Sequence, residues 1–136
     1  MDRRAFLASA AALSGGCLGI STGSSEAEYD VGMSLQAFKP RDITVTAGTR
    51  VVWKNTSSRG HTVTAYGGAI PDNAAFFATG DFDSTDQARE AFNTSGGGVI
   101  DGGETFAHTF EVPGTYNYFC IPHERGGMVG TVEVTE

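Results

Sequence analysis

Short runs in which apolar and polar residues alternate occupy most of the chain beyond residue 40. Alternation with a period of two places every second side chain on one face, which is typical of a half-buried β-strand. Gly, Pro and Asn interrupt these runs at short intervals, and many short strands with such turn signals predict an all-β sandwich or barrel. The expected strands are residues 43–46, 50–55, 61–66, 105–112, 115–120 and 128–134.

Residues 67–98 lack this alternation, and a loop of such length usually carries a function or local structure of its own. Within it, Ser84 and Gln87 have the spacing of a capping box: the serine hydroxyl accepts from the Gln87 N–H while the Gln87 side chain reaches back. We therefore expect one short surface helix in this loop. It should begin after Ser84, continue through Phe92 and end at the glycines of residues 96–98.

Residues 120–128 contain a dense set of metal donors. Cys120, His123 and Met128 contribute a thiolate, an imidazole and a thioether. Sulfur donors suit Cu(I) and imidazole suits both oxidation states, so the mixture fits a copper ion that changes its charge. Two His and one Cys in a plane with a long axial Met define the type-1, or blue, copper site. A proline and two glycines between the donors allow the loop to fold back on one ion.

A second imidazole has to come from elsewhere in the chain. His61 lies at the start of an expected strand, directly after the loop of residues 57–60, where it can reach a site formed by loops. His108 is the competing histidine, but it lies in mid-strand on the same face as Phe106 and Phe110, so we expect it to be structural. The predicted copper ligands are His61, Cys120, His123 and Met128.

The order Cys-x-Pro-His followed by Gly-Met-Val-Gly resembles the copper loop of plastocyanins and haloarchaeal halocyanins, within the cupredoxin family. Asn55 and residues 61–63 and 113–120 are also similar to the halocyanin pattern, and the resemblance covers about residues 31–136. It implies a Greek-key β-sandwich of about eight strands, with the copper near one end. It also implies that Asn55 braces the loop beside His61.

Four protein ligands fill the expected copper site, so no substrate can coordinate, and we expect an electron carrier and not an enzyme. Copper oxidases and nitrite reductases need further copper sites, usually with His-x-His pairs, and the three histidines of this chain form no such pair. A copper store or chaperone would need more Met or Cys. A structural immunoglobulin-like module leaves the ligand motif unexplained, and it remains the alternative to an electron carrier. The expected partners are redox proteins at a membrane or outside the cytoplasm, met transiently by a monomer.

The first 30 residues differ from the rest. Residues 1–16 combine a charged start containing Arg3 and Arg4 with a short apolar run, which resembles a twin-arginine export signal. This run is shorter than the roughly 20 residues that span a bilayer, which argues against a transmembrane anchor. The polar, acidic residues 17–30 predict a flexible tether to a domain at residues 31–136.

The two cysteines are expected to have separate roles. Cys17 follows small residues in a segment that resembles a lipobox, in which the cysteine becomes a lipidated N-terminus. A disulfide between Cys17 and Cys120 is the alternative in an exported protein, but a metal ligand must be a free thiolate. We therefore expect export to the outer face of the cytoplasmic membrane, with a lipid anchor on Cys17, or an extracytoplasmic location.

The chain is acidic, with a net charge of −7. This charge argues against nucleic-acid partners and against electrostatic docking on anionic lipid. It also suits a high-salt habitat such as that of haloarchaea. We expect the acidic side chains within residues 81–90 to form a solvated face.

Overall fold

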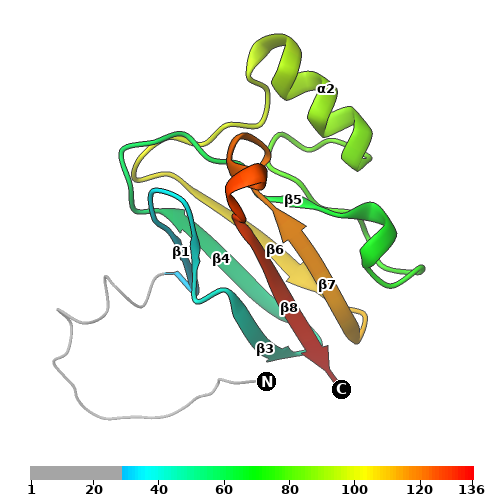
Figure 1. Cartoon of the computed structure of the whole chain (residues 1–136). Coiled ribbons are helices and arrows are strands. Elements are labelled where there is room, and N and C mark those ends of the chain that lie inside the picture. Colours follow the sequence, from blue (N-terminus) through cyan, green and yellow to red (C-terminus); the bar gives the residue numbers. More distant parts are fainter. Residues whose placement is uncertain (1–28) are drawn as a thin grey trace, which may run out of the picture.

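The computed structural model describes residues 29–136. The expected export signal (1–16), most of the tether and Cys17 lie outside the described residues. The described part forms a β-sandwich of two four-stranded sheets with one α-helix beyond its end (Figure 1). The expected all-β sandwich of about eight strands with one short helix is therefore confirmed.

The chain changes repeatedly from one sheet to the other. In the first sheet, of order β2-β1-β4-β6, β1 and β4 run parallel and the other pairs are antiparallel. In the second, of order β3-β8-β7-β5, β3 and β8 run parallel and the other pairs are antiparallel. The strands are β1 (Val31–Met33), β2 (Phe38–Lys39), β3 (Asp42–Thr46), β4 (Thr49–Asn55), β5 (Thr64–Ala65), β6 (Thr105–Phe110), β7 (Gly114–Phe119) and β8 (Val129–Thr135).

Trp53, in β4, lies at the centre of the core and has no exposed surface. Its ring centroid is 5.4–6.2 Å from those of four other aromatic side chains, at distances typical of favourable aromatic pairs. The four are Phe77, Phe106, Phe110 and Tyr118. Because Phe77 belongs to the long segment between β5 and β6, that segment contributes to the core.

The expected helix is α2 (Thr85–Ser95), and its two ends follow the sequence signals. Ser84 Oγ accepts from the Gln87 N–H at 3.1 Å, as the capping box requires. The Gln87 side chain reaches back one residue further than expected, because its oxygen accepts from the Asp83 N–H at 2.6 Å. Gly96 ends the helix with φ +72°, a left-handed conformation that suits glycine.

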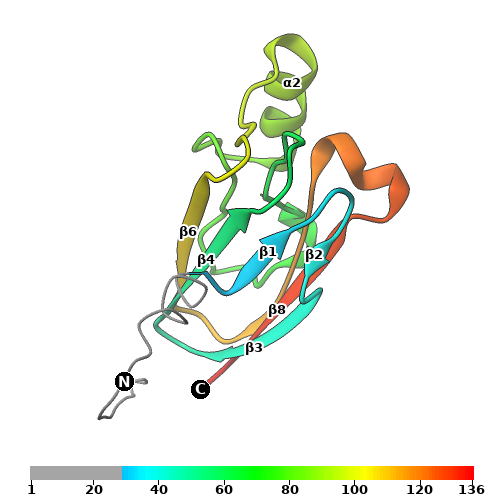
Figure 2. The ribbon, with the colours of Figure 1, turned by 90° about the vertical axis from the view of Figure 1, so that its left-hand side faces the viewer.

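Helix α2 and the short 3-10 helix η3 (Ile121–Gly126) lie toward the same end of the sandwich (Figures 1 and 2). A second 3-10 turn, η2 (Gly67–Ala69), follows β5. Within residues 29–136, no helix has the length and apolar character needed to cross a membrane.

The expected strand over residues 61–66 is wrong over most of its length. Only β5 is a strand, and His61 makes an isolated bridge with Ile100. The physical reason is that side-chain atoms take the backbone donors between them. The Thr62 N–H faces the sulfur of Cys120 at 3.4 Å, and the Val63 N–H donates to Thr79 Oγ1 at 3.2 Å.

Gly130 gives a test of how tightly β7 and β8 pack. It pairs with Tyr118, and a Cβ at this position would lie 2.5 Å from the Tyr118 hydroxyl oxygen and 2.9 Å from the Arg41 carbonyl. We expect Gly130→Ala to lower the free energy of unfolding by about 1–3 kcal/mol, the usual cost of overpacking. Chemical denaturation measures this, with Gly68→Ala as the control because a Cβ there meets no atom within 4 Å. Equal stability of the two variants would contradict the packing described here.

Candidate metal centre

Three of the four predicted ligands place their donor atoms together. The donor atoms of His61, Cys120 and His123 all lie within 4.8 Å of one another. The sulfur of Cys120 is 3.5 Å from His61 Nδ1 and 3.4 Å from His123 Nδ1. A transition metal binds sulfur at about 2.3 Å and imidazole nitrogen at about 2.1 Å, so one ion fits between donors at these separations.

The backbone of the loop after β7 brings Met128 to the same place. The Cys120 N–H donates to the Met128 carbonyl at 3.0 Å, and the Met128 N–H donates to the His123 carbonyl at 3.2 Å. Gly127, with φ +90°, supplies the left-handed turn that this closure needs. Cys120 directly follows β7 and Met128 directly precedes β8, so two paired strands fix both ends of the loop.

The site is closed on most sides. His61, Cys120 and Met128 have no exposed surface, whereas His123 is half-buried. Of the four ligands, His123 is therefore the one with exposed surface.

Burial and backbone hydrogen bonds act in opposite directions on the pKa of the Cys120 thiol. Burial raises the pKa of the Cys120 thiol, and hydrogen bonding from the Thr62 N–H opposes this rise. Thr62 also accepts, through Oγ1, from the Ile121 N–H at 2.8 Å. Thr62 therefore links the segment of His61 to the segment of Cys120 by two hydrogen bonds. A bound metal ion favours the thiolate, which is the form that coordinates.

The surroundings of both imidazoles favour the neutral form, which is the form that coordinates a metal. Burial, reinforced by the nearby His123, lowers the pKa of His61. Burial also lowers the pKa of His123, with a further contribution from the positive charge of Arg59.

A chain of hydrogen bonds orients His61. With Nδ1 toward the sulfur, Nε2 carries the hydrogen and donates to Ser57 Oγ at 3.1 Å. The Ser57 hydroxyl donates to Asn55 Oδ1 at 2.8 Å. The Asn55 amide then donates to the carbonyls of Arg59 at 2.6 Å and Ile100 at 3.0 Å. The expected bracing role of Asn55 is confirmed. The intermediate contact, Ser57, was not predicted, although its position four residues before His61 was a usable signal.

His108 lies apart from the cluster of donors, as predicted. Its ring in β6 stacks on Phe77 and meets Phe110 edge-on, each at 4.8 Å between ring centroids. Burial lowers the pKa of His108, as expected for an imidazole packed among apolar rings.

The two-sheet sandwich with a His-Cys-His cluster and a buried methionine at one end defines the class of type-1 copper proteins. Residues 25–135 match the model of the family described as "Copper binding proteins, plastocyanin/azurin family". The chain belongs to this family. The donor set fits one type-1 copper ion, with His61, Cys120, His123 and Met128 around it.

Relatives in sequence agree with this assignment, and a solved structure shares the fold. The chain is 35% identical over 97 residues to the chloroplastic plastocyanin of Hordeum vulgare, covering 71% of this chain and 54% of that protein. It is 30% identical over 97 residues to the plastocyanin of Scenedesmus fuscus, covering 71% of this chain and 85% of that one. The chain thus spans about half the length of the Hordeum protein. An oxidized variant of amicyanin shares the fold with a TM-score of 0.56 at 22% identity, covering 79% of this chain and 87% of its own.

Ser57 is expected to contribute to metal affinity through His61. Removing a partner that orients a metal-bound imidazole weakens binding by about tenfold or more, so Ser57→Ala should bind copper about tenfold less tightly than wild type. Competition with a chelator measures this affinity. Ser58→Ala is the matched control, since Ser58 is exposed and makes no hydrogen bond with any of residues 29–136. Equal affinities of the two variants would show that the Ser57 contact does not orient His61.

His108 is expected to make the fold acid-sensitive. Its pKa is lowered in the folded state, so the unfolded chain binds more protons once the pH falls below about 6.5. The contribution of His108 to the free energy of unfolding is therefore fully present above this pH, and it is lost as the pH falls toward the lowered pKa. His108→Phe should lose less stability than wild type between about pH 7 and pH 5. Denaturation curves of the two proteins across this range measure the difference in free energy of unfolding. His61 and His123 are present in both proteins, so their contributions cancel in this difference. Parallel curves for the two proteins would contradict it.

Proposed function

We propose that this protein carries single electrons between redox proteins through one copper ion held by His61, Cys120, His123 and Met128. The observation that carries the proposal is the convergence of one cysteine sulfur and two imidazole nitrogens within 4.8 Å. Membership of the plastocyanin/azurin family supports it.

The burial of the donors favours electron transfer over catalysis. Three of the four side chains are fully buried, so the protein itself fills the surroundings of the ion and leaves no position for a substrate. Bound copper supplies a one-electron change between Cu(I) and Cu(II). The backbone hydrogen bonds among Cys120, His123 and Met128 resist movement of the loop, so the same donor arrangement can serve both oxidation states.

His123 is the proposed point of electron exchange, because it is the ligand with exposed surface. A partner would meet this end of the sandwich transiently. Such redox encounters usually bury less than about 1,200 Å² in total. We propose that the carrier acts as a monomer.

We further propose a halocyanin-like protein held at the outer face of the cytoplasmic membrane. The acidic composition and the copper-loop sequence support the first part. The paired arginines at Arg3 and Arg4 and the lipobox-like segment before Cys17 support export and lipidation. Mass spectrometry of the protein purified from membranes tests the lipid. An unmodified Cys17 would remove the anchor from the proposal.

Substitution of the thiolate ligand tests the proposed function. The wild-type protein with Cu(II) should show an intense blue absorption band that ascorbate bleaches and ferricyanide restores. Cys120→Ser should lose this band and yet remain folded by circular dichroism, because the core around Trp53 is independent of the metal. A colourless wild-type protein would refute the proposal. An unfolded Cys120→Ser variant would show instead that the site contributes more to stability than the core packing suggests.

A further inference from the structure

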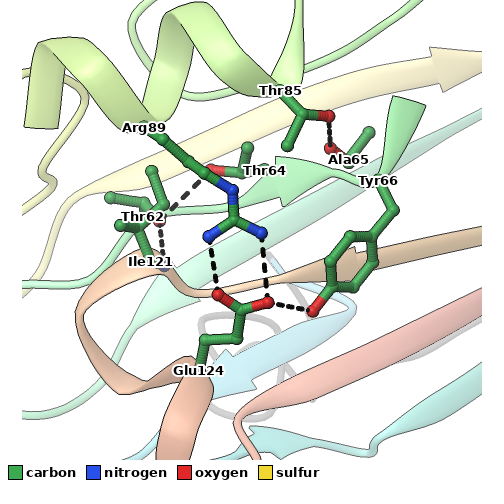
Figure 3. A network of polar contacts seen from close by, with 8 residues as sticks. All are labelled: Thr62, Thr64, Ala65, Tyr66, Thr85, Arg89, Ile121 and Glu124. Atoms are coloured by element: carbon green, nitrogen blue, oxygen red, sulfur yellow. Dashed lines mark hydrogen bonds and ion pairs between the residues drawn. The ribbon is translucent and has the colours of Figure 1, made fainter. Parts of the chain in front are cut away.

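Helix α2 is joined to the copper-ligand loop by a bidentate ion pair (Figure 3). Arg89 Nη1 lies 2.7 Å from Glu124 Oε1, and Arg89 Nη2 lies 3.1 Å from Glu124 Oε2. Glu124 directly follows His123 in η3. The insertion between β5 and β6 therefore contacts the residue next to a ligand.

Two aromatic rings complete this contact. The Tyr66 hydroxyl donates to Glu124 Oε2 at 2.6 Å, so the carboxylate accepts three hydrogen bonds. The ring of Phe119 packs against both side chains that donate to Glu124. It stacks on the Tyr66 ring at 4.2 Å between ring centroids, and the Arg89 guanidinium carbon lies 4.5 Å from the Phe119 centroid. Phe119 directly precedes Cys120, so the cluster touches the chain on both sides of the Cys120–His123 segment.

Thr85 fixes the other end of the same helix face. Thr85 Oγ1 donates to the Ala65 carbonyl at 2.8 Å and accepts from the Gly67 N–H at 2.8 Å. Thr85 and Arg89 are four residues apart and therefore lie on one side of α2. Thr85 attaches that side to the end of β5, and Arg89 attaches it to η3 (Figure 3).

We propose that Arg89, Glu124 and Tyr66 form a clamp by which α2 positions the copper-ligand loop. The inference rests on the proposed function. The Glu124 carbonyl accepts from the Gly127 N–H at 2.9 Å, and the adjacent His123 carbonyl accepts from the Met128 N–H at 3.2 Å. Holding the Glu124 side chain therefore holds the backbone turn that carries His123 and places Met128. Arg89 and Glu124 are positioning residues, since neither is a ligand.

The mutual geometry favours a positioning role over a surface contact of little effect. The side chains of Arg89 and Glu124 are 36% and 29% exposed, and a single pair with such exposure is usually worth little. Here the ion pair is bidentate, and Tyr66 adds a third hydrogen bond to the carboxylate. The Arg89 guanidinium also packs on the buried ring of Phe119. These contacts fix the direction of the ion pair and restrict both side chains.

Replacing Arg89 tests the clamp in the copper-loaded protein. Arg89→Met keeps the length of the side chain and removes the ion pair. Arg125→Met is the matched control, because it makes the same chemical change one residue after Glu124, at an exposed arginine that pairs with no side chain of residues 29–136. In the Cu(I) form, nuclear magnetic resonance measures hydrogen exchange of the Gly127 and Met128 amides. Transfer to a chelator measures the rate of copper loss.

The clamp predicts that both rates rise roughly threefold or more in Arg89→Met and stay near wild type in Arg125→Met. The double variant Arg89→Met/Glu124→Gln separates positioning from charge, because it removes one charge of each sign. It should behave like Arg89→Met. A return of the double variant to wild-type rates would overturn the clamp and leave an electrostatic effect.

Failure of this inference is distinguishable from failure of the proposed function. A wild-type protein without a blue thiolate–copper band would refute the function, whatever the variants do. A blue wild-type protein with equal rates in Arg89→Met and Arg125→Met would refute the clamp alone. If Arg89→Met does not fold, Glu124→Gln breaks the same ion pair and gives the same comparison.

Discussion

The packing of the two sheets against each other is the constraint on which the copper site depends. His123 belongs to the same loop as Cys120, but His61 comes from a segment far from both in the chain, so it reaches the sulfur only when the two sheets pack. The aromatic core around Trp53 provides that packing. Thr62 then joins the two segments directly, through its N–H to the sulfur and its hydroxyl oxygen to the Ile121 N–H.

Burial disfavours the thiolate form of Cys120 when no cation is present, and a bound metal cation favours that form. Burial raises the pKa of Cys120 and lowers those of the two histidines, so charge is disfavoured at all three donors. A metal cation offsets this for the sulfur and needs the imidazoles neutral. The surroundings of His61 are fixed by Ser57 and Asn55, and those of His123 by the short loop. A site held in this way has little freedom to rearrange when an electron arrives or leaves.

The sequence predicted the ligands well because the copper loop is local. Cys120, His123 and Met128 lie in the single loop between β7 and β8, where their spacing in the sequence limits the geometry. The cap of α2 at Ser84 was predictable for the same reason. Contacts between distant segments were not. The strand predicted at His61 failed because a sulfur atom and the Thr79 hydroxyl take the backbone donors, and no periodicity encodes those partners. The pairing of Arg89 with Glu124 likewise depends on where α2 lies against the sandwich.

The most direct test of the central claim is X-ray absorption at the copper edge, recorded on the oxidized and on the reduced protein. We expect one sulfur and two imidazole nitrogens at bonding distance in both states, with only small changes in their distances on reduction. This result would establish that Cys120, His61 and His123 hold the ion without rearrangement, as an electron carrier requires. Loss of an imidazole on reduction, or the absence of a short copper–sulfur distance in the oxidized state, would contradict the account.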